Sequence, residues 1–191
     1  SGFQGPLVLP GKYTADLIIG DKVTREEFEL KADPDADYTL EERKKQFETS
    51  MQVYDQMQAL SDRTNEINSF QKQIDAYLTQ TKDEKLKKAL SVYRDSLENL
   101  RKEILPTKAT SIFADEERMR ERISQIYSQI LSYEGLPNNF IFKRIEGLQK
   151  EAAKLSDRHM KINDKQLKPL NEKLKKAGLS DLKLEVKEAK P

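Results

Sequence analysis

Apolar residues recur at steps of three and four over most of this chain, the spacing that places them along one face of an α-helix. The first such run extends from Leu40 to Leu78 and is preceded by Thr39. Thr39 and Glu42 have the spacing of a capping box, in which each side chain bonds the backbone N–H of the other residue. The predicted stripe consists of Leu40, Phe47, Met51, Tyr54, Met57, Leu60, Ile67, Phe70, Ile74 and Leu78.

A second and a third helix are predicted downstream. Thr81 and Glu84 again have the capping-box spacing, and Pro106 ends the second helix because it cannot continue one. The third helix is expected to begin near Asp115 and to end at Gly135, a residue suited to the left-handed C-terminal position. Their apolar faces are Leu86, Leu90, Tyr93, Leu97, Leu100 and Ile104 in the second helix, and Met119, Ile123, Ile126, Ile130 and Tyr133 in the third.

A fourth predicted helix extends to Gly178, and Pro169 is expected to kink or interrupt it. Its apolar face comprises Ile141, Ile145, Leu148, Ala152, Leu155, His159, Ile162, Leu170 and Leu174. Outside the helices the period changes to two, which is typical of strands. Two alternating stretches flank Gly20-Asp21, an order that favours a type II′ hairpin turn, and Leu182–Val186 predicts a third strand.

These elements predict a mainly α protein of the α+β class, an antiparallel four-helix bundle with two long and two short helices. Residues 1–34 would form the hairpin, 35–179 the bundle, and 180–191 a strand and tail that joins the hairpin. Charge favours an antiparallel first and fourth helix, because 26–48 holds 9 acids and 4 bases and 143–176 holds 11 bases and 5 acids. The alternative is an extended three-helix bundle with the middle helices end to end.

Composition excludes several classes of site. The 191 residues include no cysteine, so disulfides, thiolate metal sites and a cysteine nucleophile are excluded. A net charge of +1 gives no general attraction to nucleic acid, and no apolar run is long enough to span a membrane. The start, Ser1-Gly2 followed by Phe3 and Gln4, is typical of a trimmed fragment, which makes a larger parent protein the expectation.

His159 is the single histidine, and it limits the chemistry that the chain can perform. A ferritin-like di-metal site needs two Glu-x-x-His pairs, whereas the residue three before His159 is Ser156. Haem ligation and serine–histidine catalysis with Ser156 and Asp157 are weaker interpretations than a structural histidine bonded to a neighbour. Paired acids such as Glu41-Glu42, Asp83-Glu84 and Glu116-Glu117 stand at predicted helix starts, where the helix dipole favours them. The sequence therefore predicts no catalytic, cofactor-binding or metal-binding residue.

The basic run from Lys165 to Gly178 has two interpretations. Leu167, Leu170 and Leu174 share a face among lysines, a pattern that suits an anionic surface. The more common cause of such a pattern is a solvated helix end that is packed by its leucines. The helical seams are similarly compatible with an intermolecular coiled coil, although packing against one another within the chain is simpler.

The segment GPLVLPGKYTADLIIGDKVTREEFELKADPD, residues 5–35, resembles part of a known family. The matching positions are Gly5, Pro6, Val8, Pro10, Gly11, Tyr13, Leu17, Asp33 and Pro34. The segment is similar to the C-terminal region of secreted bacterial BNR-repeat or sortilin-like β-propeller proteins, often labelled glycosyl hydrolases. The family's hairpin turn is usually Asp-Gly, and here the order is reversed. The resemblance covers about 30 residues and implies the end of an immunoglobulin-like module followed by a helical tail, in the periplasm or at the cell surface.

Three functional hypotheses follow. The first is a non-catalytic C-terminal accessory domain that acts in docking, spacing or assembly, with the upstream propeller or another protein as its partner. The second is a carbohydrate- or peptide-binding module that assists substrate capture, which would require exposed Tyr and Phe on one surface. The third is an independent enzyme. The hairpin edge would also allow oligomerisation.

Overall fold

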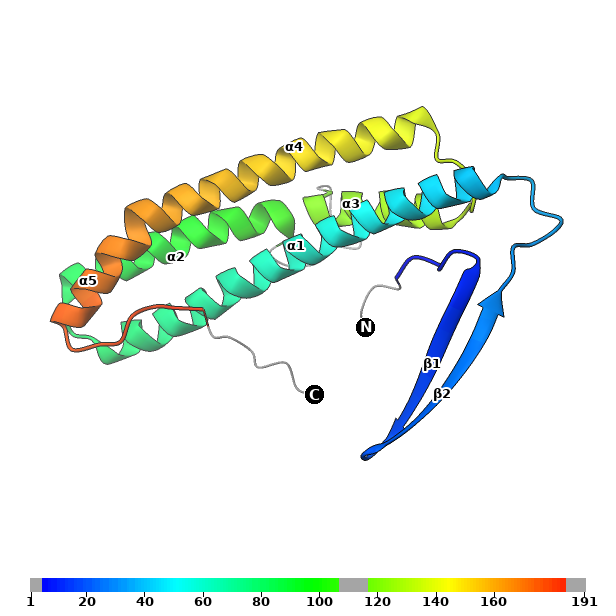
Figure 1. Ribbon diagram of the computed structural model, residues 1–191. Helices are drawn as coiled ribbons and strands as arrows, with labels where there is room; N and C mark the ends of the chain where they lie inside the picture. The colour runs from blue at the N-terminus through cyan, green and yellow to red at the C-terminus, as the bar shows by residue number, and fades with distance from the viewer. Residues whose placement is uncertain (1–4, 107–116, 185–191) are drawn as a thin grey trace. The chain divides into compact units, whose positions relative to one another are not determined.

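The computed structural model describes residues 5–106 and 117–184, and it is mainly helical with one small antiparallel hairpin (Figure 1). The mainly helical class expected from the sequence is confirmed. The elements in chain order are β1 (Gly11–Ile19), β2 (Lys22–Leu30), α1 (Leu40–Gln80), α2 (Glu84–Ile104), α3 (Met119–Leu131), α4 (Asn139–Ile162), the π-helical turn η1 (Asn163–Leu167) and α5 (Lys168–Lys176).

The described chain divides into two compact units that share α1. Unit 1 comprises the described residues of Ser1–Asp55 and Gln125–Arg144, which are the hairpin, the start of α1, the end of α3 and the start of α4. Unit 2 comprises those of Gln56–Ser124 and Ile145–Pro191, which include the rest of α1, all of α2 and most of the rod formed by α4, η1 and α5. The domain boundaries drawn from the sequence at 34 and 179 stay a prediction.

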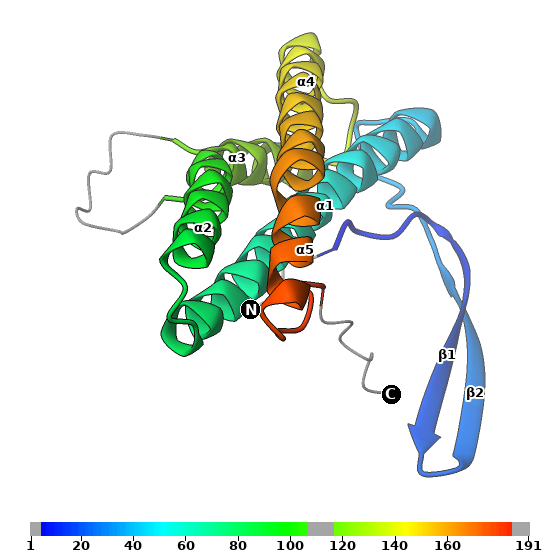
Figure 2. The same ribbon diagram turned by 90° about the vertical axis from the view of Figure 1, so that its left-hand side faces the viewer.

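In unit 2 the C-terminal half of α1, the helix α2 and the α4–α5 rod lie along one another (Figures 1 and 2). All six residues of the predicted α2 seam are buried, as are Met119 and Ile123 of α3. Gln71 of α1 donates to Glu98 of α2, and Asp75 pairs with Arg94, so these two helices are antiparallel.

The predicted antiparallel pairing of the first and fourth helices is wrong. Arg63 of α1 is bonded to His159 of α4, and further along both helices Tyr77 donates to the carbonyl of Ser180, just after α5. The two helices therefore run in the same direction within unit 2. The prediction rested on complementary charge, and exposed ion pairs are worth only about 0–1 kcal/mol each, too little to fix the direction in which two helices pack. The four-helix bundle itself is not confirmed.

The predicted strand at the C-terminal end is wrong for Leu182–Leu184, which form no strand; Glu185 and Val186 lie outside the described residues. The backbone of Leu182 exchanges two hydrogen bonds with the side chain of Asn171 in α5, and the backbone of Lys183 exchanges two with Gln73 in α1. Side chains rather than a neighbouring strand satisfy these backbone groups, and Leu182 is buried whereas Leu184 is 48% exposed, so the alternation does not mark one buried side.

Helix ends agree with the sequence in part. Thr39 and Glu42 form the predicted capping box, with bonds of 2.8 and 3.2 Å, and Gly178 ends α5 with φ +73°. The second capping box is wrong, because the N-cap of α2 is Asp83, whose carboxylate accepts from the backbone of Lys85 and Leu86. Asp83 directly precedes the helix, so its carboxylate reaches these N–H groups, whereas Thr81 lies two residues further from it.

The end of α3 also differs from the prediction. This helix ends at Leu131, and Gly135 does not adopt a positive φ. Tyr133, predicted on the buried face, lies beyond the helix and is 49% exposed. The predicted start near Asp115 lies outside the described residues.

Pro169 changes the helix as expected, although it does not end it. The turn before it widens into the π-helical η1, in which the N–H of Lys168 bonds the carbonyl of Asn163 five residues back. A wider turn accommodates the proline ring and its missing N–H, and the rod bends there (Figure 1).

Candidate functional site

The first turns of α1 bury polar side chains in unit 1, which the hydrophobic spacing of the sequence does not predict. Arg43, Gln46, Thr49 and Ser50 are at most 3% exposed, whereas Leu40 is 64% exposed. Phe47, Met51 and Tyr54, which were predicted for the buried stripe, are only half-buried. The buried face of this half of α1 is therefore rotated away from the predicted one.

Arg43 is the centre of this polar group. Its Nε lies 3.1 Å from Glu134 Oε2, and its Nη1 donates to Gln46 Oε1 at 2.5 Å. Nη2 donates to the carbonyls of Leu7 and Val8, at 2.8 and 3.3 Å. Planar guanidinium groups suit such multiple donation. Arg43 thus ties the segment before β1 to α1 and to the segment after α3.

Two further hydrogen bonds stabilise unit 1 near the base of the hairpin, one between α1 and α3 and one between β1 and the segment before it. Gln46, which accepts from Arg43, also joins α1 to α3, because its Nε2 donates to the carbonyl of Ile130 at 2.8 Å. The hydroxyl of Tyr13 donates to the carbonyl of Leu9 at 2.5 Å. The base of the hairpin is therefore bonded to the helical part of unit 1 through buried contacts.

A pocket of about 310 Å³ adjoins this base and is lined by residues that include Val8, Leu30, Tyr38, Arg43 and Glu134. Tyr38 donates to Glu134 at 2.8 Å, and this bond to a carboxylate raises the pKa of Tyr38. Tyr133 packs edge-on to Tyr38 at 6.3 Å between ring centroids. A Cβ at Gly135 would collide with the Tyr133 ring, so this glycine permits the close approach of the ring.

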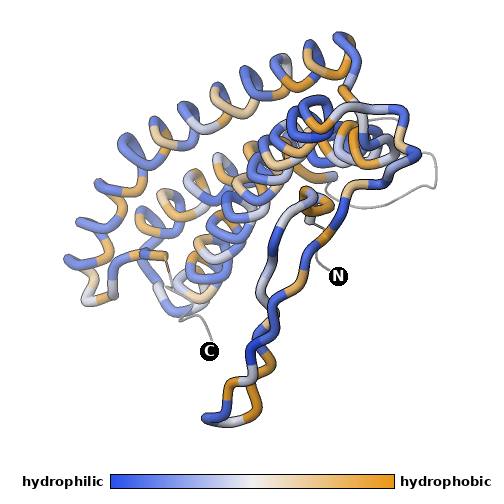
Figure 3. Tube along the Cα trace, turned by 45° about the vertical axis from the view of Figure 1, so that its right-hand side comes forward, coloured by the Kyte–Doolittle hydropathy of each residue, from blue (hydrophilic) through white to orange (hydrophobic). Residues whose placement is uncertain are grey.

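The hairpin has two different faces. Cross-strand partners share a face, and the pairs Tyr13–Phe28 and Leu17–Thr24 show that one face also carries Ala15, Ile19 and Leu30, with Glu26 and Lys22 as its charged members. Leu17, Ile19 and Phe28 on this apolar face are 52–70% exposed. Figure 3 shows apolar segments along the hairpin, with several near its tip.

The opposite face carries charge. Lys12 pairs across the strands with Glu29, and Asp16 with Arg25, whose guanidinium forms two bonds of 2.8 Å to the carboxylate. These bonds lower the pKa of Asp16. At the tip, Gly20 has φ +59° and Asp21 has no positive φ, which excludes a type I′ turn and fits the predicted type II′ turn.

In unit 2, His159 is fully buried, and Nη1 of Arg63 donates to its Nδ1 at 2.7 Å. Its Nε2 has no hydrogen-bond partner among the described residues and lies 3.9 Å from Glu66 Oε1. Burial, and then the charge of Arg63, lower the pKa of His159 to about 4, so the ring is neutral at pH 7. Burial also raises the pKa of Glu66.

The histidine cluster does not have the geometry of nucleophilic catalysis. Ser156 accepts a hydrogen bond of 3.0 Å from Nη2 of Arg63. Nδ1 of His159 accepts a hydrogen bond from the same guanidinium, so it is not bonded to the serine. Asp157 is exposed. Over 5–106 and 117–184, no group of three or more His, Cys, Asp or Glu side chains is placed to hold a metal ion. No helix in the same ranges combines the length and the apolar character that crossing a membrane requires.

The basic run from Lys165 to Gly178 is packed by its leucines, as the more common interpretation of this pattern predicted. Leu170 and Leu174 are 3% and 0% exposed, and Leu167 is half-buried. Sequence periodicity places these leucines on one face, but it does not show that the unit's own core covers them.

No protein-family model matches this chain, and comparisons with curated proteins and with solved structures gave no match either. The resemblance of the hairpin to a propeller-associated module therefore stays a prediction.

Proposed function

We propose that this chain is a non-catalytic C-terminal accessory domain of a secreted β-propeller protein, docking through its hairpin on the rest of its polypeptide or on another protein. The observation that carries the proposal is the apolar face of the hairpin, whose Leu17, Ile19 and Phe28 are more than half exposed. A two-stranded sheet is marginal alone and gains stability when a further sheet or helix covers one face.

The base of the hairpin supports the same conclusion. Arg43 bonds Leu7 and Val8 at the foot of β1, so the hairpin projects from a fixed attachment. Covering Leu17, Ile19 and Phe28 would contribute about 1.5–3 kcal/mol for each side chain. The preferred occupant is the remainder of an immunoglobulin-like module upstream of Gly5, because residues 5–35 resemble the end of such a module. A location in the periplasm or at the cell surface rests on the same resemblance.

Hydrogen exchange tests the proposal. Amides of β1 and β2 should exchange rapidly in this chain and at least about tenfold more slowly in the longer polypeptide that includes residues upstream of Gly5. Amides of α2 in unit 2 serve as the internal control and should not change. Equal exchange of the hairpin amides in both proteins would contradict docking of the hairpin upstream.

A second candidate, a carbohydrate- or peptide-binding module, is favoured by one observation in unit 1. The paired rings of Tyr38 and Tyr133 stand beside the Arg43–Glu134 pocket, and aromatic rings with adjacent polar groups suit sugars or peptides. Binding to a glycan or peptide array should be lost in Tyr133→Ala and kept in Tyr77→Phe, which removes only a hydroxyl group from unit 2. Absence of binding by the unaltered chain would remove this candidate.

A further inference from the structure

A groove on unit 2 combines positive charge with an apolar floor. It encloses about 330 Å³ between α2 and the rod of η1 and α5. Four lysines stand around it: Lys85 and Lys88 on α2, Lys165 on η1 and Lys173 on α5. Among the described residues, no Asp or Glu side chain lines the groove. Its positive charge is therefore not neutralised locally.

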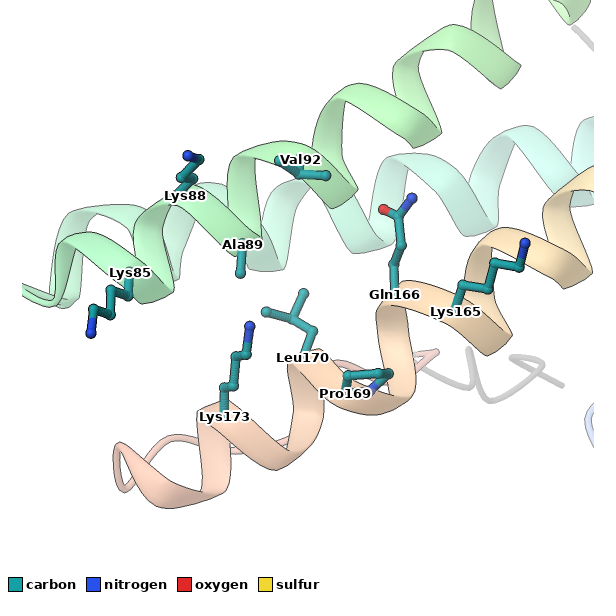
Figure 4. Close-up of a pocket in the computed structure, with 9 residues that line it drawn as sticks. All are labelled: Lys85, Lys88, Ala89, Val92, Lys165, Gln166, Pro169, Leu170 and Lys173. Carbon is teal, nitrogen blue, oxygen red and sulfur yellow. The ribbon is translucent and has the colours of Figure 1, made fainter.

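The floor of the groove is apolar. Ala89 and Val92 come from α2, and Pro169 and Leu170 from the facing rod. In Figure 4, Leu170 and Lys173 point from α5 toward α2, and Ala89 points back toward α5. Val92 is 51% exposed, so an apolar surface is open to solvent between the two rows of lysines.

These four lysines differ from their neighbours in lacking partners. Lys87 pairs with Glu84, Lys168 with Asp164 and Lys175 with Asp181. For the side chains of Lys85, Lys88, Lys165 and Lys173, the described part of the chain provides no ion pair and no hydrogen bond. Unpaired lysines around one groove leave a positive potential that an acidic partner would complement.

The distribution of the charges selects the kind of anion. Lys165 and Lys173 are eight residues apart, roughly 12 Å along the helical rod. One phosphate or carboxylate group cannot contact both ends of that row. The leucines of this segment are buried in unit 2 and cannot enter a membrane, since Leu170 and Leu174 are at most 3% exposed. A ligand with several negative charges spread along an apolar centre matches this groove better than a single small anion or a membrane surface does.

We infer that this groove binds an acidic amphipathic segment of a partner protein, with apolar side chains on Ala89, Val92 and Pro169 and carboxylates facing the two rows of lysines. The inference does not depend on the proposed function, because the groove lies in unit 2 and the hairpin in unit 1. It assigns a second interaction surface to the chain. Helix-in-groove recognition by apolar anchors with charged flanks is the corresponding binding mode.

Fluorescence anisotropy with the full chain tests this inference. The probe is a synthetic helix about three turns long, with leucines on one face flanked by glutamates, and a second probe has glutamine at every glutamate. The acidic probe should bind at least about tenfold more tightly than the glutamine probe, and raising the salt from about 0.05 M to about 0.5 M should weaken its binding. Equal binding of the two probes would overturn the inference.

Matched variants locate the site. The double substitution Lys88→Glu and Lys173→Glu should weaken binding of the acidic probe at least about tenfold. Lys87→Glu with Lys168→Glu causes the same change in net charge outside the groove and should weaken it less than about threefold. Val92→Ser tests the floor and should also reduce affinity, and circular dichroism should show that every variant keeps its helical content. Equal effects of both double variants would overturn the site.

Two further ligands distinguish other sources of negative charge. Inorganic phosphate and vesicles that contain phosphatidylserine should not compete with the acidic probe at the salt concentration of the assay. Vesicle binding that is lost in the Lys88/Lys173 variant, without binding of the acidic probe, would overturn the inference in favour of a membrane site.

Discussion

Arg43 and His159 are two buried basic side chains with different hydrogen-bond partners. The guanidinium of Arg43 contacts the carboxylate of Glu134 and donates to three further oxygen acceptors. His159 is fully buried and has the cationic Arg63 as its bonded neighbour, and both conditions favour the neutral ring.

The histidine should make folding stability depend on pH. Its folded pKa of about 4 lies below the ordinary value of 6.5, so between these values the unfolded chain binds more protons and stability falls as the pH falls. From pH 7 to pH 5 the loss should reach about 2 kcal/mol. His159→Gln keeps an acceptor for Arg63 and should flatten this slope in urea titrations followed by circular dichroism. Parallel pH profiles of the two proteins would contradict the assignment.

Arg43 should hold the base of the hairpin to α1. Replacing it with Met removes the bonds to Leu7 and Val8, leaves Gln46 Oε1 without its donor and leaves Glu134 with only the bond from Tyr38. Because Glu134 is partly exposed, we expect a loss of about 2–3 kcal/mol in unfolding free energy, below the roughly 3–5 kcal/mol for a fully buried pair. Urea denaturation measures it, and the exposed neighbour Lys44→Met should change it by less than about 0.5 kcal/mol. A similar small change for Arg43→Met would contradict the role.

Residue-scale features were only partly predictable from the sequence. The burial of Arg43, Gln46, Thr49 and Ser50 was missed because hydrophobic spacing assigns polar residues to the exposed face. The available signal was their own spacing of three and four along α1. That spacing becomes informative only when the partners are known, and Glu134 and Leu7 are far from Arg43 in the chain.

At the scale of elements, two glycines in or next to the rod of α4, η1 and α5 should affect stability in opposite directions. Gly147 lies in the middle of α4, where an added Cβ would meet no atom within 4 Å, whereas Gly178 ends α5 with φ +73°. Gly147→Ala should therefore raise the unfolding free energy by about 0.5–1 kcal/mol, and Gly178→Ala should lower it by about 1 kcal/mol. Thermal denaturation of the two variants measures both changes. A shift of the same sign in both would contradict these assignments.

The elements themselves were predictable wherever the period was long and uninterrupted. The α2 seam and the Thr39 capping box were correct because helix-forming patterns act over adjacent turns. The strand at Leu182 was wrong because the side chains of Asn171 and Gln73 satisfy the backbone groups of Leu182 and Lys183, and a spacing of period two does not reveal such partners. The predicted direction of α4 relative to α1 was wrong because it rested on complementary exposed charge, which contributes only about 0–1 kcal/mol per ion pair and does not fix the direction of packing.

At the scale of the whole molecule, the chain is nearly neutral and carries an uncovered apolar face. Its net charge is +1 and its pI is about 7.7, so electrostatic repulsion between copies is weak near that pH. The hairpin leaves Leu17, Ile19 and Phe28 in solvent. These two properties together favour association of copies through the hairpin whenever its docking partner is absent.

Sedimentation velocity of the full chain near pH 7.7 should show an average mass that rises with protein concentration. Leu17→Glu with Ile19→Lys places one acid and one base on the apolar face, so it should reduce this association without changing the net charge. Ile18→Glu with Val23→Lys alters the charged face by the same chemistry and should leave most of the association in place, because Ile18 and Val23 are cross-strand partners on that face. If both double variants reduce association equally, the apolar face is not the contact. If only the first does, the face that the proposed partner would cover is the one that copies of the chain bury against each other.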